Sequence, residues 1–144
     1  TPSQSSAASD VYKRQLMNEL NHALTSFYNA TVELGVSDKV TTFTASDFGR
    51  TLTSNGDGTD HGWGSHQMVM GDGVDGGKIF GTMPELAIGS NDDIGEGRII
   101  PTTSVDQYAA TLAGWYGLTP SQIAETFPTL AKFNTADLGF MRFD

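Results

Sequence analysis

Glycine is concentrated in the middle of this chain, and that concentration limits the fold more than any other feature. Thirteen of the 17 glycines lie between Gly49 and Gly97. Because glycine loses much backbone entropy on folding and has no side chain to pack, this stretch favours turns and loops. The sequence therefore predicts a long glycine-rich loop region, interrupted by short strands at His66–Met70 and Lys78–Phe80.

Regular elements are predicted on both sides of the loop region. Apolar residues recur at steps of three and four from Leu16 to Leu34, just before a glycine, which is typical of an amphipathic helix. Val40–Ala45 is rich in β-branched residues and predicts a strand. Ser104 and Thr119 each begin an S/T-x-x-Q capping box, which predicts two helices, the second ending near Pro128. Helices packed on a partial sheet make an α/β fold.

Composition excludes several classes of protein. The 144 residues, 38% of them hydrophobic, are enough for one domain with a modest core. A net charge of -9 opposes binding to nucleic acid, and no apolar run is long enough to span a membrane. The absence of cysteine excludes disulfides and thiolate metal ligands.

The first fifteen residues differ from the rest of the chain. Residues 1–15 are polar and have no period, and their SSAASDVYKRQ portion resembles the translated adapter sequence left at the ends of assembled environmental reading frames. We expect residues 1–15 to be a non-native leader and residues 16–144 to be one domain, truncated just before Leu16.

Carboxylates and imidazoles gather in and before the stretch GTDHGWGSH, which ends at His66. Asp47 follows the predicted strand, and Asp60, His61 and His66 follow within twenty residues. Oxygen and imidazole donors of this kind bind zinc or manganese. Adjacent Asp60 and His61 point to opposite sides of an extended chain, so they reach one centre only if the glycines bend it.

Each of these residues also has a structural interpretation. Asp47 can cap a turn or pair with Arg50, His66 can be a hydrogen-bonded strand residue, and the whole stretch can be a flexible surface loop. A further alternative is a calcium-stabilised binding module, because oxygen donors alternate with glycine in SNGDGTD, from Ser54 to Asp60. The calcium pattern is incomplete, since no glutamate closes the loop.

The segment from Val40 to Leu86 resembles the C-terminal part of the DUF1501 family, bacterial proteins grouped with the alkaline phosphatase and sulfatase superfamily. The resemblance is carried by SDFGRT at Ser46–Thr51, by Asn55, and by GTDH at Gly58–His61. It extends over about residues 16–144. The implied fold is the C-terminal part of an alkaline-phosphatase-like α/β domain.

The resemblance also implies a metal centre. In that superfamily two metal ions activate a nucleophile and stabilise a phosphoryl or sulfuryl group in transfer. Carried over to this chain, the metal ligands are Asp47, Asp60 and His61, with His66 behind them, and the metal is zinc, manganese or calcium. Arg50 is the expected contact to an oxyanion. Phe48 stands where a second ligand after the strand is expected.

The implied activity is hydrolysis of a small phosphate or sulfate ester by an exported protein, periplasmic or secreted, because family members commonly begin with a twin-arginine signal. The nucleophile would lie in the N-terminal part of the same domain, which would precede Leu16, so this fragment is expected to be inactive alone. The alternative is a non-catalytic member of the fold whose glycine-rich loop binds a structural cation or a partner.

Overall fold

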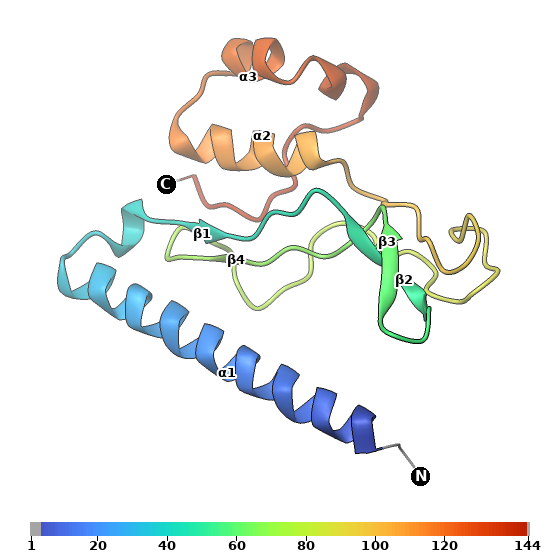
Figure 1. Cartoon of the computed structure of the whole chain (residues 1–144). Coiled ribbons are helices and arrows are strands. Elements are labelled where there is room, and N and C mark those ends of the chain that lie inside the picture. The colour runs from blue at the N-terminus through green and yellow to red at the C-terminus, as the bar shows by residue number, and fades with distance from the viewer. Residues whose placement is uncertain (1–3, 144) are drawn as a thin grey trace.

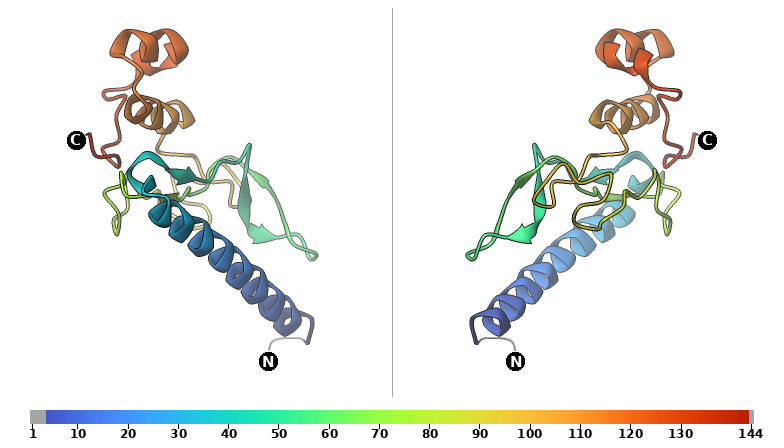
Figure 2. Two further views of the ribbon diagram at one scale, coloured as in Figure 1. Left: turned by 90° about the vertical axis from the view of Figure 1, so that its left-hand side faces the viewer. Right: turned by 90° about the vertical axis from the view of Figure 1, so that its right-hand side faces the viewer.

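The computed structural model describes residues 4–143 and shows a long helical arm leading into a body of loops, two small sheets and a helical layer (Figure 1). Views from both sides show the arm projecting away from the body (Figure 2). The elements follow one another as α1 (Gln4–Glu33), η1 (Ser37–Lys39), β1 (Thr42–Phe43), β2 (Gly49–Ser54), β3 (Thr59–Gly62), β4 (Val69–Met70), α2 (Val105–Tyr116), α3 (Pro120–Thr126) and η2 (Pro128–Lys132).

The predicted mixture of α and β structure is confirmed, in the form of two separate two-stranded sheets. β1 pairs with β4, and β2 pairs with β3, and both pairs are antiparallel. Each of the predicted strands Val40–Ala45 and His66–Met70 shortens to two residues, which lie opposite one another in the β1–β4 ladder. Around this short ladder, the backbone N–H of Thr44 donates to the carbonyl of Met68 at 2.9 Å.

The predicted strand at Lys78–Phe80 is wrong, because this segment has no strand pairing in the structure. A strand-like backbone pairing occurs just before this segment, at Val74, which forms an isolated antiparallel bridge with Met141. The N–H of Asp75 donates to the carbonyl of Phe140 at 2.9 Å. A distant segment thus supplies the backbone partners of this part of the loop region.

Helix α1 confirms the helix predicted from Leu16 but begins much earlier, at Gln4, and runs without interruption past residue 15. It ends where predicted, before Gly35, whose φ is +66°. Its last turns are held to the body, since the Tyr28 hydroxyl donates to Asp72 Oδ1 at 2.5 Å. Hydrogen bonds from the side chains of Ser37 and Tyr28 lower the pKa of Asp72.

Both predicted C-terminal helices are confirmed together with their caps. Ser104 and Thr119 each take part in a complete capping box, and the backbone N–H of Asp106 donates to Ser104 Oγ at 3.1 Å. α2 ends at Gly117, whose positive φ allows the left-handed turn that satisfies the last carbonyls. α3 stops before Pro128, as predicted.

The core is small and lies under α2. Val74, Phe140 and Met141 are buried, and the partly buried side chains around them come mainly from α2 and the loops. Val69 of β4 is the one member of this cluster that comes from a strand, so α2 packs on loops more than on a sheet. The partly buried members are Val69, Phe80, Tyr108, Leu112, Trp115 and Leu138.

Much apolar surface remains uncovered. The accessible surface is 10363 Å², whereas a compact monomer of this mass exposes roughly 7,200 Å². Exposed large side chains include Phe27, Leu34, Trp63 and Ile79. None of the helices within residues 4–143 combines the length and apolar character needed to cross a bilayer.

Candidate functional site

The candidate residues lie on and around the β2–β3 hairpin. Gly49 pairs with Gly62 and Arg50 with His61, and an irregularity separates these pairs from the one closing the turn. At the turn, the N–H of Asn55 donates to the carbonyl of Gly58 at 3.0 Å. A stretch of the predicted loop region is therefore an ordered hairpin.

The side-chain oxygens of the hairpin turn accept hydrogen bonds from backbone N–H groups of the same turn. Asn55 Oδ1 accepts from the N–H of Asp57 at 3.1 Å, and Ser54 Oγ accepts from the N–H of Gly56 at 3.2 Å. These are the local side-chain to backbone bonds that stabilise turns. The alternation of glycine with Asn and Asp, which suggested a calcium loop, has a structural role here.

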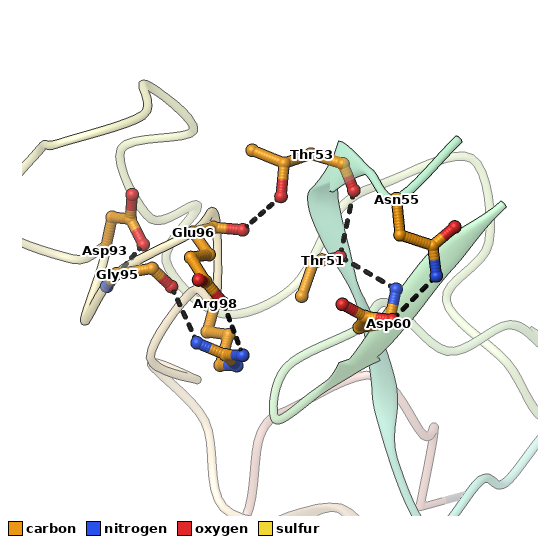
Figure 3. A network of polar contacts seen from close by, with 8 residues as sticks. All are labelled: Thr51, Thr53, Asn55, Asp60, Asp93, Gly95, Glu96 and Arg98. Atoms are coloured by element: carbon orange, nitrogen blue, oxygen red, sulfur yellow. Dashed lines mark hydrogen bonds and ion pairs between the residues drawn. The ribbon is translucent and has the colours of Figure 1, made fainter. Parts of the chain in front are cut away.

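Asp60 is held by two neighbours across the hairpin. Its carboxylate Oδ1 accepts from the Asn55 amide at 2.7 Å, and its backbone N–H donates to Thr51 Oγ1 at 3.1 Å (Figure 3). Thr51 is 4% exposed, so this hydroxyl anchors Asp60 to the buried side of the hairpin, whereas the Asp60 side chain is exposed. The second carboxylate oxygen has no protein partner in the described structure, which leaves it free to bind a ligand.

His61 is positioned by stacking. Its ring lies 3.9 Å from the ring of Phe48 between centroids, with 23° between the planes. The guanidinium carbon of Arg50 lies 5.4 Å from the same Phe48 centroid. Stacking covers a face of the imidazole and leaves its nitrogens at the ring edge. Phe48, which stands where a second metal ligand was expected, orients His61.

Arg50 is directed along the hairpin. Its Nη1 donates to the carbonyl of Thr59 at 2.8 Å, and it does not pair with Asp47 in the described structure. Asp47 makes no side-chain hydrogen bond to the following turn in the described structure either, and at this turn Ser46 Oγ donates to the carbonyl of Phe48 at 2.9 Å.

The four candidate ligands thus fall into two groups. Asp60 and His61 are consecutive residues of strand β3, so their side chains point to opposite faces of the hairpin, and both are exposed. Asp47 and His66 are exposed in the connections before β2 and after β3. Among residues 11–143, no three acidic or imidazole side chains come close enough together to hold a metal ion. The donor chemistry fits a divalent metal, but this stretch supplies only part of a ligand set.

A loop from residue 85 to 99 supports the hairpin from outside. The N–H of Leu52 donates to the carbonyl of Gly97 at 3.0 Å, and Thr53 Oγ1 donates to the carbonyl of Glu96 at 2.6 Å (Figure 3). The loop is organised by Asp93, whose carboxylate accepts from the N–H groups of Gly89 at 2.9 Å and Gly95 at 2.8 Å. This role of Asp93 was not predicted from the sequence.

The backbone hydrogen bonds to Asp93, from Gly89 first, lower the pKa of its carboxyl group. A lowered folded-state pKa stabilises the fold above the ordinary pKa of aspartate, and this stabilisation is lost as the pH falls through the folded value. We therefore expect the protection factors of the Gly89 and Gly95 amides, which are corrected for the intrinsic exchange rate at each pH, to fall as the solution is acidified below that range. Asp93→Asn is expected to have lower protection factors at neutral pH and to lose their dependence on pH. Hydrogen exchange measured against pH on both proteins checks this, and an identical pH dependence in the variant would contradict it.

A separate hollow of about 300 Å³ lies between α2, α3 and the segment that follows η2. Its lining is mostly apolar and includes Gly114, Leu118, Ile123 and Phe143. None of the candidate metal ligands lines it, so the hollow and the hairpin are different features.

Comparison with known proteins gives one match. A family model described as "Protein of unknown function (DUF1501)" matches residues 7–127, which is most of the chain and includes the hairpin and α2. No curated protein and no solved structure matches the chain.

Proposed function

Because the chain belongs to the DUF1501 family, we propose that its hairpin supplies part of a divalent-metal site for hydrolysis of a small phosphate or sulfate ester. The observation that carries this proposal is the pair Asp60 and His61, consecutive and exposed on β3. The neighbouring glycines would have to bend the strand for both side chains to reach one metal ion. Each has a neighbour that orients it, Asn55 for the carboxylate and Phe48 for the imidazole. Partners of this kind fix the orientation of metal ligands in proteins.

One carboxylate and one imidazole suit zinc or manganese better than calcium, which prefers oxygen ligands alone. A metal bound there would neutralise charge on the phosphoryl or sulfuryl group. Arg50 lies opposite His61 in the ladder and is the candidate for a charge-assisted contact to an ester oxygen. Its Nη1 already donates to the carbonyl of Thr59, so the other guanidinium N–H groups would make that contact.

The proposed site needs further ligands and a nucleophile. Asp47 and His66 are candidates for the former, each requiring a shift of an exposed connection. We assign the remaining groups to the N-terminal part of an alkaline-phosphatase-like DUF1501 domain, in a protein exported to the periplasm or secreted.

The test uses a complete DUF1501 protein that contains this segment. We expect His61→Ala and Asp60→Asn to reduce retained zinc or manganese after dialysis at least about tenfold, and to abolish hydrolysis of a nitrophenyl phosphate or sulfate ester. His22→Ala is the matched control, because His22 is an exposed imidazole on α1. Metal content equal in all four proteins would rule out the site.

A second candidate is a non-catalytic protein whose hairpin binds a structural cation or a partner. The observation that favours it is the exposed apolar surface beside the metal candidates, at Phe48, Leu52, Trp63 and Met68. Metal lost from the His61 and Asp60 variants, with no ester hydrolysis by the unaltered protein, would decide for this candidate.

A further inference from the structure

Helix α1 carries an apolar stripe with no partner in the structure. Among the described helices and strands, α1 contacts η1 alone, and its N-terminal part projects away from the body in the views from both sides (Figure 2). We define the seam as the six residues Leu16, Leu20, Ala23, Phe27, Ala30 and Leu34. All six are exposed, with 40% of Leu16, 42% of Leu20, 50% of Phe27 and 75% of Leu34 open to solvent.

The seam residues are spaced for contact with another helix. They follow one another at steps of four, three, four, three and four, which is the 3.5-residue repeat of paired helices. The N–H of Leu34 donates to the carbonyl of Ala30 at 3.0 Å, so the helical bonding reaches the last member of the seam. The seam is about 27 Å long.

Side-chain size along the seam selects an antiparallel partner with the same sequence. We propose that α1 pairs with α1 of a second copy of this chain, with Leu20 facing the partner's Ala30 and Ala23 facing the partner's Phe27. Every large residue in the middle of the seam then meets a small one, as close packing requires. In a parallel pair Phe27 would face the partner's Phe27, and Ala23 would leave a void against the partner's Ala23.

Charge permits this pairing. The chain as a whole carries -9, but helix α1 contains two basic residues, Lys13 and Arg14, and three acidic ones, Asp10, Glu19 and Glu33, for a net charge of -1. The arm therefore adds little to the repulsion between two acidic bodies.

Surface area supports a second copy as the occupant. The chain exposes about 3,000 Å² more than a compact monomer of its mass, and a standard interface buries about 800 Å² of each partner. A pair of α1 helices would thus cover part of the surplus. This inference does not depend on the proposed metal site.

The first experiment measures orientation by disulfide formation between single-cysteine variants. The chain has no cysteine, so Leu20→Cys and Ala30→Cys each introduce one thiol. We expect a disulfide-linked dimer when the two variants are mixed and mildly oxidised, and little from either variant alone, because facing residues bring their Cβ atoms within disulfide range. Dimers from each variant alone, or no dimer in the mixture, would overturn the proposal.

The second experiment measures association by sedimentation equilibrium of the 144-residue chain. We expect a dimer that Phe27→Ala weakens at least about a hundredfold, because truncating a packed phenylalanine costs several kcal/mol at each of two equivalent contacts. Val32→Ala, which truncates a side chain 49% exposed outside the seam, is expected to leave association unchanged. Helix content measured by circular dichroism shows that both variants fold. A monomer at every concentration, or equal effects of the two substitutions, would overturn the proposal.

Discussion

Replacing Gly49 with alanine is expected to destabilise the protein by about 3 kcal/mol or more and to open the β2–β3 hairpin. A Cβ at position 49 would lie 1.8 Å from the carbonyl oxygen of Gly64 and 2.6 Å from its carbonyl carbon. Both are backbone atoms, so the overlap is relieved only if the chain moves, and movement breaks the pairing of Gly49 with Gly62. Chemical denaturation gives the loss of stability, and hydrogen exchange at Asp60 and His61 reports the opening of the hairpin.

Gly58→Ala is the matched control for this substitution. Gly58 lies in the turn of the same hairpin, and a Cβ there would meet no atom within 4 Å. We expect its effect on the free energy of unfolding to stay within about 1 kcal/mol. Equal destabilisation by the two alanines would show that the close approach of Gly49 to Gly64 does not hold the hairpin.

Phe140→Ala is expected to cost about 3–5 kcal/mol, the range for truncating a buried phenylalanine. Phe140 is 4% exposed, its ring lies edge-on to Phe80 with centroids 6.1 Å apart, and it contacts Tyr108 of α2 with centroids 5.6 Å apart. Because the core has few members, the remaining side chains cannot refill the cavity. Thermal and urea unfolding measure the loss.

The matched control is Phe143→Ala, three residues further along the same segment. Phe143 is 58% exposed, so its truncation is expected to cost about 1 kcal/mol or less. If the two phenylalanines gave the same change in unfolding free energy, Phe140 would not be the centre of the core.

The sequence predicted the helices well because their signals are local. The capping residues Ser104 and Thr119 and the stop at Gly35 each act on a backbone turn next to them, and the structure confirms all three. The strands were predicted less well. Strand pairing joins residues distant in the chain, and nothing near Val74 indicates that its backbone partner is Met141.

In the candidate site, too, local features could be predicted from the sequence and contacts between distant segments could not. SNGDGT, from Ser54 to Thr59, contains Asn-Gly and Asp-Gly, which are strong hairpin signals, and this signal could have revealed the hairpin. The position of Asp60 and His61 on one strand follows from that turn. The stacking of Phe48 on His61 could not be predicted, because it depends on how the chain enters β2. The separation of Asp47 and His66 from the pair likewise depends on loop paths.

The contact of Val74 with Met141 has a consequence for the order of events during synthesis. The ribosome makes α1, the hairpin and α2 well before Phe140 and Met141, yet these two residues make up most of the fully buried core cluster. The apolar side of α2 must therefore remain exposed to solvent until residue 141 has emerged from the ribosome. Folding of this body is expected to be a late, single event rather than a gradual one, and chaperones would have their longest access to the nascent chain while α2 is exposed.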